Sequence, residues 1–538
     1  MAERRLRLTE KYMHFPIEEG QPEVQMTMKG ENMLRQFTIR LADGAADYWM
    51  SVDIGSLRNQ EVTVSVNECK QEQLGALEQG GSIKHAEQLY REHSRPQLHF
   101  SARRGWLNDP NGLVYADGLY HLFYQHNPYD RNWGNMHWGH AVSRDLLHWQ
   151  EQEIALYPDK MGTMFSGSAV VDWHNTSGLQ EGEASPLVML YTAAGGTSAL
   201  SEGKQHTQCL AYRNAQGGWS KYEGNPVVPH MADGNRDPKV IWHEPTRRWV
   251  MALYLEGNDY GILVSPDLKQ WHMTCRLTMP GMDECPDLFP LPVDGDAARA
   301  KWVFWACKRG GYQLGDFDGE IFTPESDVMY TVPEGANSYA AQTWSDIPAS
   351  DGRVIQTSWA RGTSWPGMPF TGYMTFPCEL ALVTTDDGIR MALTPIREIR
   401  LIRQGVTSFG PRRLTGSHAP LEHGMELLDI ELEWKPDERS KLTIESNGSS
   451  IVYDADAEQV TCGQAVSPLR KRPDGTVKLR IIADRTSLET FGNDGLLYMP
   501  VSIPPKPEAQ GLRIFAGEGA GELLSLEIHE LESIWAAP

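Results

Sequence analysis

Five short runs of apolar and aromatic residues in the middle of the chain constrain its fold most strongly. They begin about 50 to 70 residues apart, which fits one four-stranded blade of a β-propeller for each run. The runs are Leu119–Tyr124, Leu187–Tyr191, Trp249–Tyr254, Trp302–Trp305 and Arg353–Trp359. Residues 96–400 are therefore expected to form five blades.

A second repeat supports the same interpretation. The segments Ser143–Trp149 and Ser265–Trp271 both read S-x-D-L-x-x-W. They lie between different pairs of apolar runs, so they are expected to form the same turn and strand in two separate blades.

A polar or charged cluster precedes each apolar run. The clusters are Asn108–Gly112, Phe165–Ser168, Arg236–Lys239, Glu284–Asp287 and Gln342–Trp344. The first strand of each propeller blade lines the central axis, so five such openings would converge on one axial pocket. Turn-forming Asp-Pro and Asn-Gly pairs could account for one or two of the clusters, but not for carboxylates in three of them.

The segments on either side are also β-rich. In residues 1–95, four alternating stretches (25–28, 36–41, 48–54 and 62–66) predict a small β-sandwich with an accessory or packing role. One short helix is expected around Gln71–Arg91, with Leu74, Leu77 and Leu89 on one face. In residues 401–538, the stretches 427–434, 441–444 and 477–483 predict a second β-sandwich, and Asp484–Gly495 is expected to contain a strand that ends in a hairpin turn. The fold class is all-β.

Composition excludes several classes of partner. The formal net charge of -22 argues against nucleic acid and against an anionic membrane surface, whereas a neutral sugar is compatible with it. No stretch approaches the roughly 20 apolar residues of a membrane span. No secretory signal is visible, so we expect a cytoplasmic protein if the native chain starts at Met1, and a secreted one if it has been trimmed.

Metal and disulfide chemistry are not expected. The seven cysteines are scattered without a CxxC pair, which is typical of free thiols. His126, His137 and His140 lie close in sequence, but no acidic or cysteine ligand has a spacing typical of zinc. Cys285 has no obvious His-Asn partners, so we interpret it as pocket wall and not as a nucleophile.

Three of the clustered residues carry carboxylates suited to breaking a glycosidic bond. That reaction needs one ionised and one protonated carboxyl group. Asp109, Asp237 and Glu284 are the candidates, and their mutual repulsion would raise the pKa of at least one. Arg236 is expected to hold Asp237 ionised. From the residues alone the individual roles stay open, although the flanking asparagines suit Asp109 as nucleophile and the longer side chain suits Glu284 as acid.

Three motifs in this order resemble glycoside hydrolase family 32, the β-fructofuranosidases, levanases and inulinases. They are Trp106–Gly112 (WLNDPNG), Arg236–Pro238 (RDP) and Glu284–Pro286 (ECP). Secondary similarities occur at 133–138, 165–168, 338–344 and 484–489. The resemblance covers roughly residues 95 to 535 and leaves the N-terminal region outside it.

The resemblance implies a five-bladed propeller followed by a β-sandwich. It implies that Asp109 is the nucleophile, that Glu284 is the acid/base and that Asp237 stabilises the transition state. It also implies a fructose subsite lined by seven further residues. These are Asn108, Gln125, Trp133, Phe165, Ser166, Arg236 and Trp344. No metal or organic cofactor is implied.

The leading functional hypothesis is a retaining exo-hydrolase that releases terminal fructose from fructans, fructo-oligosaccharides or sucrose. A fructosyltransferase could use the same covalent intermediate. A non-catalytic fructan-binding protein and an inverting arabinanase-type enzyme are the alternatives from other classes. The preferred linkage, exo or endo cleavage and the oligomeric state stay open.

Overall fold

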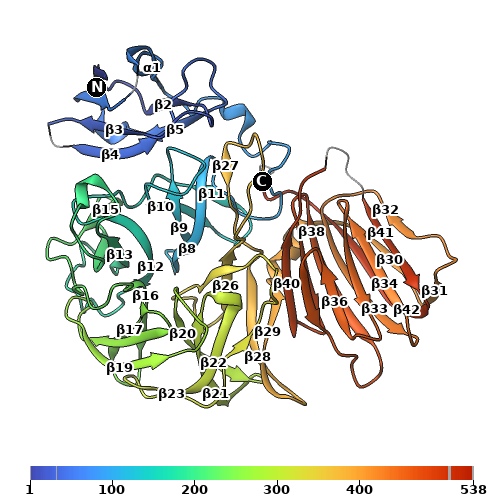
Figure 1. The fold of residues 1–538 in the computed structure, drawn as a ribbon. Coiled ribbons are helices and arrows are strands. Elements are labelled where there is room, and N and C mark those ends of the chain that lie inside the picture. The colour runs from blue at the N-terminus through green and yellow to red at the C-terminus, as the bar shows by residue number, and fades with distance from the viewer. Residues whose placement is uncertain (1, 32, 69, 507–510, 536–538) are drawn as a thin grey trace.

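The structure is a computed structural model that describes residues 2–31, 33–68, 70–506 and 511–535. Its regular secondary structure is almost entirely β-strand, which confirms the all-β class. Figure 1 shows three parts in chain order: a small N-terminal domain (blue) beside the first blade, a ring of blades (cyan to yellow), and a C-terminal sandwich (orange to red) against the last blades.

The N-terminal domain contains two antiparallel sheets, with strand orders β1-β6-β3-β4 and β5-β2-β7. Every second residue of β3 and β5 is buried, as half-exposed strands require, and both sheets contribute to one hydrophobic core. The strands are β1 (Ala2–Arg7), β2 (Tyr12–Ile17), β3 (Val24–Lys29), β4 (Leu34–Ile39), β5 (Tyr48–Asp53), β6 (Glu61–Val66) and β7 (Glu78–Gly80).

The helix expected over Gln71–Arg91 is wrong in its extent. The helix α1 covers only Gln71–Gly75. Leu74 is buried in the domain core, but Leu89 is only partly buried and lies outside that core. The chain turns into β7 directly after α1, where residues 78–80 pair with β2, so the apolar spacing did not continue as one helical face.

The propeller contains five antiparallel blades. Blade one is β8 (Gly105–Ala116), β9 (Leu119–Asn127), β10 (His137–Ser143) and β11 (Trp149–Glu151); blade two is β12 (Thr163–Val171), β13 (Leu187–Ala194), β14 (Thr207–Arg213) and β15 (Trp219–Lys221); blade three is β16 (Arg236–His243), β17 (Arg248–Glu256), β18 (Asp259–Ser265) and β19 (His272–Thr278); blade four is β20 (Asp287–Val293), β21 (Asp296–Ala306), β22 (Gly311–Phe317), β23 (Phe322–Pro324) and β24 (Met329–Tyr330); blade five is β25 (Tyr339–Thr343), β26 (Val354–Trp359), β28 (Cys378–Thr385) and β29 (Gly388–Pro395). A short strand, β27 (Phe370–Thr371), pairs in parallel with β8 and joins the last blade to the first.

The five apolar runs form the second strand of each blade, namely β9, β13, β17, β21 and β26. The polar clusters lie on or directly before the first strands, β8, β12, β16, β20 and β25. β8 contacts β12 and β25, and β16 contacts β12 and β20. Residues from all five clusters line one small cavity, among them Pro110, Ser166, Asp237, Cys285 and Gln342. The expectation that the clusters face a common axis is therefore confirmed.

The S-x-D-L-x-x-W repeat folds into the same turn twice. Asp145 and Asp267 each accept hydrogen bonds from the backbone N–H groups two and three residues later. The following residues, Leu146 and Leu268, are both left-handed, with φ of 66° and 64°. In each turn the tryptophan donates its indole N–H to this leucine's carbonyl oxygen.

The C-terminal sandwich consists of two sheets around an apolar core. The first sheet contains β30 (Arg403–Phe409), β31 (Arg412–Thr415), β33 (Leu428–Pro436), β38 (Val477–Asp484), β39 (Ser487–Gly492), β40 (Leu497–Ser502) and β42 (Ala520–Leu531); the second contains β32 (Leu421–His423), β34 (Lys441–Ser446), β35 (Ser449–Asp454), β36 (Gln459–Cys462), β37 (Ala465–Pro468) and β41 (Leu512–Glu518). The expected hairpin is present between β39 and β40, with Asn493 and Asp494 at positive φ.

A buried polar cluster joins the sandwich to the propeller. His99 hydrogen-bonds to Asp484 through Nδ1 at 2.7 Å and to Glu489 through Nε2 at 3.0 Å. Asp484 also accepts two backbone N–H bonds from the segment preceding His99. Because an unpaired buried charge is costly, this arrangement requires both domains to be in place.

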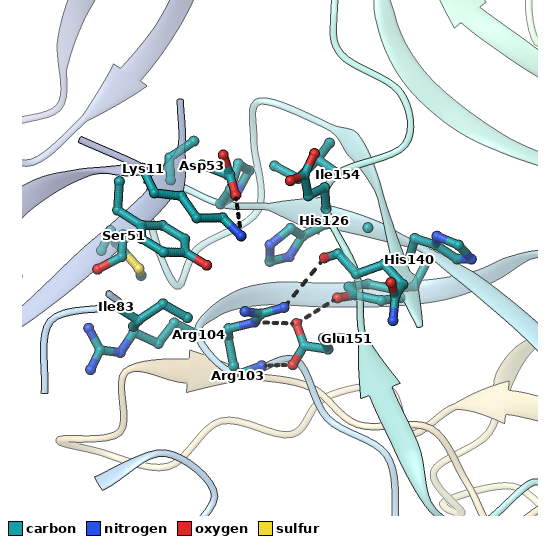
Figure 2. A pocket seen from close by; sticks show the side chains of 18 residues that line it. Lys11, Ser51, Asp53, Ile83, Arg103, Arg104, His126, His140, Glu151 and Ile154 are labelled. Carbon is teal, nitrogen blue, oxygen red and sulfur yellow. Dashed lines mark hydrogen bonds and ion pairs between the residues drawn. The ribbon is translucent and has the colours of Figure 1, made fainter. Parts of the chain in front are cut away.

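The N-terminal domain and blade one enclose a polar cavity of about 250 Å³ at their junction. Figure 2 shows that Lys11 pairs with Asp53 on the N-terminal side, while Arg103 pairs with Glu151 on the propeller side. None of the three candidate carboxylates lines this cavity.

The six described cysteines are free thiols, and Cys69 lies outside the described residues. Within the described part of the chain, no helix is long and apolar enough to cross a bilayer.

Candidate active site

The candidate carboxylates come from blades one, three and four. Asp109 lies on β8, Asp237 lies on β16, and Glu284 lies three residues before β20. The pairing register shifts between Leu107 and Pro110 in β8 and between Arg236 and Lys239 in β16. Such bulges re-aim a side chain away from the regular alternation, and here they occur at Asp109 and Asp237.

The backbone at the site is strained. Asp237, Glu284 and Cys285 have φ of 62°, 44° and 39°, in the left-handed region that non-glycine residues rarely adopt. Ala340, on the opposing strand β25, also has a positive φ of 53°. Residues held in such conformations cluster at functional sites because the surrounding structure must compensate for their strain.

Each carboxylate has its own set of donors. Ser166 donates its hydroxyl hydrogen to Asp109 Oδ2 at 2.7 Å. The backbone N–H of Cys285 donates to Asp237 Oδ2 at 3.1 Å. The two oxygens of Glu284 are bound separately, Oε1 by the Arg236 guanidinium and Oε2 by the Tyr339 hydroxyl.

Desolvation is the main electrostatic effect on the two aspartates. It raises the pKa of Asp109 to about 6, against the hydrogen bond from Ser166 and with added repulsion from Glu284. It raises the pKa of Asp237 to about 7, against the attraction of Arg236. Arg236, whose Nε lies 3.8 Å from Asp237 Oδ2, favours the ionised form of Asp237 as expected, but burial outweighs its effect on the pKa. The guanidinium also hydrogen-bonds to Glu284.

Two aromatic residues lie beside the site, where Phe165 directly precedes Ser166, the residue that binds Asp109. Trp133 lies in the loop between β9 and β10, and 56% of its surface is exposed. Its ring meets Phe165 edge to face, with the centroids 6.2 Å apart. A tryptophan this exposed gains little from core packing, so it is available as a sugar platform.

The polar residues behind Asp109 form a supporting layer. Asn108 accepts the indole N–H of Trp106 at 2.6 Å. Gln125 is buried and donates to the carbonyl oxygen of Met164 at 2.8 Å. With its amide turned to satisfy both ends, Asn111 donates to Ser166 and accepts from Gln125. The structure thus brings Asn108, Ser166 and Gln125 to the site, with Gln125 in the supporting layer.

Trp344 does not lie at the site, and its assignment to the fructose subsite is wrong. Only 5% of its surface is exposed, and its indole N–H donates to the carbonyl oxygen of His121. Its ring packs with Tyr120 and Trp149 in the propeller core. Trp344 follows the end of β25, whereas Gln342, on the strand, lines the axial cavity with Asp237 and Ser166.

Sequence reasoning missed Tyr339. It lies in the segment 338–344, for which the family resemblance implied Trp344 as the residue that contacts fructose. The hydroxyl of Tyr339 binds Glu284 directly, and its ring packs edge-on against Trp359. A register shift between Tyr339 and Gln342 turns this part of β25 toward the carboxylates.

Cys285 contributes a protonated thiol. Its Sγ lies 3.5 Å from Asp237 Oδ2 and 3.9 Å from Asp109 Oδ2. A hydrogen bond with Cys307, burial and the nearby carboxylates raise its pKa well above the usual value. This environment does not suit a thiolate nucleophile.

The three histidines His126, His137 and His140 are held by structural contacts within blade one and its surroundings. Across the described residues, no group of three or more His, Cys, Asp or Glu side chains could hold a metal ion. His126 and His137 bind backbone carbonyl oxygens, and His140 contacts His121.

The sequence matches two family models that together span both large parts of the fold. The N-terminal domain of glycosyl hydrolases family 32 matches residues 99–395, and the C-terminal domain of that family matches residues 402–530. This chain belongs to glycoside hydrolase family 32. The family models begin at the propeller, so the domain formed by β1–β7 lies outside them.

Individual family 32 relatives agree. The chain is 39% identical to a levanase of Bacillus subtilis over 83% of its own length and 72% of that protein. It is 31% identical to an extracellular exo-inulinase of Aspergillus niger, over 83% of this chain and 96% of that protein.

Solved structures show the same fold. An exo-inulinase from Aspergillus awamori superposes with a TM-score of 0.74 at 29% identity, covering 83% of this chain and all of the other. A fructofuranosidase from Schwanniomyces occidentalis complexed with fructose superposes with a TM-score of 0.74 at 26% identity, over 82% and 99% of the two chains.

Proposed function

We propose that this family 32 enzyme is a retaining exo-fructosidase that releases terminal β-D-fructofuranosyl units from fructans, fructo-oligosaccharides or sucrose. The observation that carries the proposal is the convergence of Asp109, Asp237 and Glu284 on one strained, desolvated site. The named relatives, a levanase and exo-inulinases, support fructose-containing substrates.

The first half of the reaction uses two of the carboxylates. Asp109 in its ionised form attacks the anomeric carbon of the terminal fructose, and the bond to the leaving oxygen breaks. Glu284 gives its proton to that oxygen. Asp109 is then esterified to the sugar, and Glu284 is left as a carboxylate held by Arg236 and Tyr339.

In the second half, Glu284 takes a proton from water, and the resulting hydroxide equivalent attacks the anomeric carbon. The ester bond to Asp109 breaks and fructose leaves with retained configuration. Asp237 binds fructose hydroxyls and stabilises the positive charge that develops on the ring. Its elevated pKa suits a group that shares a proton with those hydroxyls.

The rim residues would hold the fructose ring in this geometry. Trp133 and Phe165 present aromatic surface on one side of the site. Asn108, Ser166 and Arg236 supply polar contacts around the carboxylates. No cofactor takes part in the proposed chemistry.

The proposal is tested by incubating the purified enzyme separately with sucrose, inulin and levan and following the products by chromatography. Free fructose from the first time points, without shorter oligomers, is the expected result. The relative rates would identify the preferred linkage. An early ladder of oligomers would instead indicate endo cleavage, and longer oligosaccharides at high sucrose would indicate transfer.

The nucleophile is tested with Asp109→Ala. We expect kcat to fall by a factor of ~10³ or more, because the covalent route is lost. Asp267→Ala, the same change in a turn of blade three, is the matched control and should keep kcat. If Asp109→Ala turns over at the rate of the unaltered enzyme, Asp109 is not the nucleophile.

A further inference from the structure

We infer that the N-terminal domain, which lies outside the family models, is a positioning element of the active site. Its strand β4 fixes the propeller segment Tyr129–Asn135, which carries the exposed Trp133. The inference rests on the proposed function in one respect, the role of Trp133 as a sugar platform.

The segment Tyr129–Asn135 has few backbone hydrogen bonds of its own. It connects β9 to β10, and the carbonyl oxygen of Asp130 accepts one backbone bond, from Trp106. Gly134 and Asn135 both have positive φ, of 149° and 46°. A loop of this kind depends on side chains and neighbouring elements for its conformation.

Strand β4 supplies one such neighbour along its free edge. It is the last strand of the sheet β1-β6-β3-β4, so the outward backbone groups of Thr38 have no partner strand. The side-chain amide of Asn135 takes that place. Its oxygen accepts the N–H of Thr38 at 2.9 Å, and its nitrogen donates to the carbonyl oxygen of Thr38 at 2.9 Å.

Tyr129 is packed as a core residue of the N-terminal domain. Its ring stacks on Phe37 of β4, with centroids 3.6 Å apart and planes within 3°, and it meets Phe15 edge to face. Only 1% of its surface is exposed. The beginning of the propeller segment is therefore buried in another domain.

Two ion pairs complete the attachment. Arg40 binds the buried carboxylate of Asp130, whose other oxygen accepts two hydrogen bonds from Asn132, the neighbour of Trp133. Glu19 binds Arg131 at 2.8 Å. The chain of contacts runs from Arg40 through Asp130 to Asn132, the residue directly before Trp133.

The test compares Arg40→Met, Arg40→Lys and the matched control Arg58→Met. Arg58 lies in the same domain and donates to Thr9 without reaching the segment. We expect Arg40→Met to raise KM for sucrose about 5-fold while kcat changes less than 2-fold. Arg40→Lys should restore most of the affinity, and Arg58→Met should leave KM unchanged.

A double-mutant cycle with Trp133→Ala shows whether Arg40 acts through the tryptophan. In the Trp133→Ala background, we expect Arg40→Met to change KM less than 2-fold. Equal effects of Arg40→Met in both backgrounds would overturn the inference. If Arg40→Met proves unstable, Asn135→Gly removes the amide that binds Thr38 while keeping the left-handed backbone, and the same outcomes apply.

Hydrogen–deuterium exchange of residues 129–136 provides a readout that does not depend on activity. Exchange should be several-fold faster in Arg40→Met than in Arg58→Met. Unchanged exchange would overturn the inference whatever the enzyme's substrate. If exchange is faster in Arg40→Met but Trp133→Ala leaves KM unchanged, the N-terminal domain still fixes the segment. The proposed role of Trp133 in substrate binding would then be overturned.

Discussion

At the scale of single residues, the site depends on two buried carboxylates whose ionised forms are destabilised by desolvation. Asp109 and Asp237 are desolvated enough that their pKa values rise to about 6 and 7. The hydrogen bond from Ser166 opposes this rise at Asp109. The balance between burial and the groups that favour the charged form, Ser166 first among them, therefore sets the lowest pH at which the nucleophile is ionised.

Ser166→Ala is expected to shift the acidic limb of the pH profile of kcat/KM to higher pH by about one unit. A hydrogen bond to a charged group contributes about 1.5 kcal/mol or more, and one pH unit corresponds to about 1.4 kcal/mol. Because the nucleophile must be ionised, its activity is lost as pH falls through the raised pKa. Measurement of kcat/KM from pH 4 to 9 checks this, and an acidic limb that moves downward or stays in place contradicts it.

Asp109→Asn should make the folded protein more stable at neutral pH while abolishing turnover. A carboxyl group whose folded-state pKa is raised costs stability once pH exceeds that pKa, and the amide removes this cost. We expect a rise in Tm of a few degrees at pH 7.5 that disappears near pH 4. A Tm below that of the unaltered enzyme at pH 7.5 would show that the amide loses more hydrogen bonding than it gains.

At the scale of elements, the repeated turn offers two matched sites for one experiment. Asp145 and Asp267 each cap the turn before the last strand of a blade. Replacing either by Ala leaves two backbone N–H groups without their acceptor, at a cost of about 1–2 kcal/mol.

Thermal unfolding of Asp145→Ala, Asp267→Ala and the double variant checks this expectation. Each single change should lower Tm by a few degrees, and the two effects should add because the turns lie in different blades. A double variant no less stable than the singles would mean that the two blades do not unfold together.

The strands and blades were predictable because short-range patterns determine them. The five apolar runs became the five second strands, and the S-x-D-L-x-x-W repeat became the same turn twice. The 71–91 helix failed because leucine spacing cannot show that residues 78–80 pair with β2. Nor could alternation alone show that the bulge in β25 directs Tyr339, and not Trp344, to the site.

At the scale of the whole molecule, the propeller and sandwich are joined through a buried histidine. Burial lowers the pKa of His99, but hydrogen bonds to Asp484 and Glu489 raise it more, to about 9. The segment 484–489 was recognised in the sequence only as a family similarity. Asp484 and Glu489, the two ends of this segment, both bind the imidazole of His99, which precedes the first propeller blade.

The pH dependence of stability follows from the raised pKa of His99. Its contribution is fully present below about pH 6.5 and is lost as pH rises through about 9, amounting to a few kcal/mol. We expect Tm to fall over this range, and His99→Gln to lower Tm at pH 6.5 and flatten the dependence. The exposed His272→Gln is the control. A slope that persists in His99→Gln would assign the effect to other groups.

The burial of Tyr129 in the N-terminal domain also bears on how the chain is made. Residues 1–95 leave the ribosome before blade one, but their core stays incomplete until Tyr129, whose ring stacks on Phe37, has been synthesised. The N-terminal domain therefore reaches its final packing only together with the first blade. The part of the chain needed to complete the N-terminal domain therefore extends beyond residues 1–95, to at least residue 135.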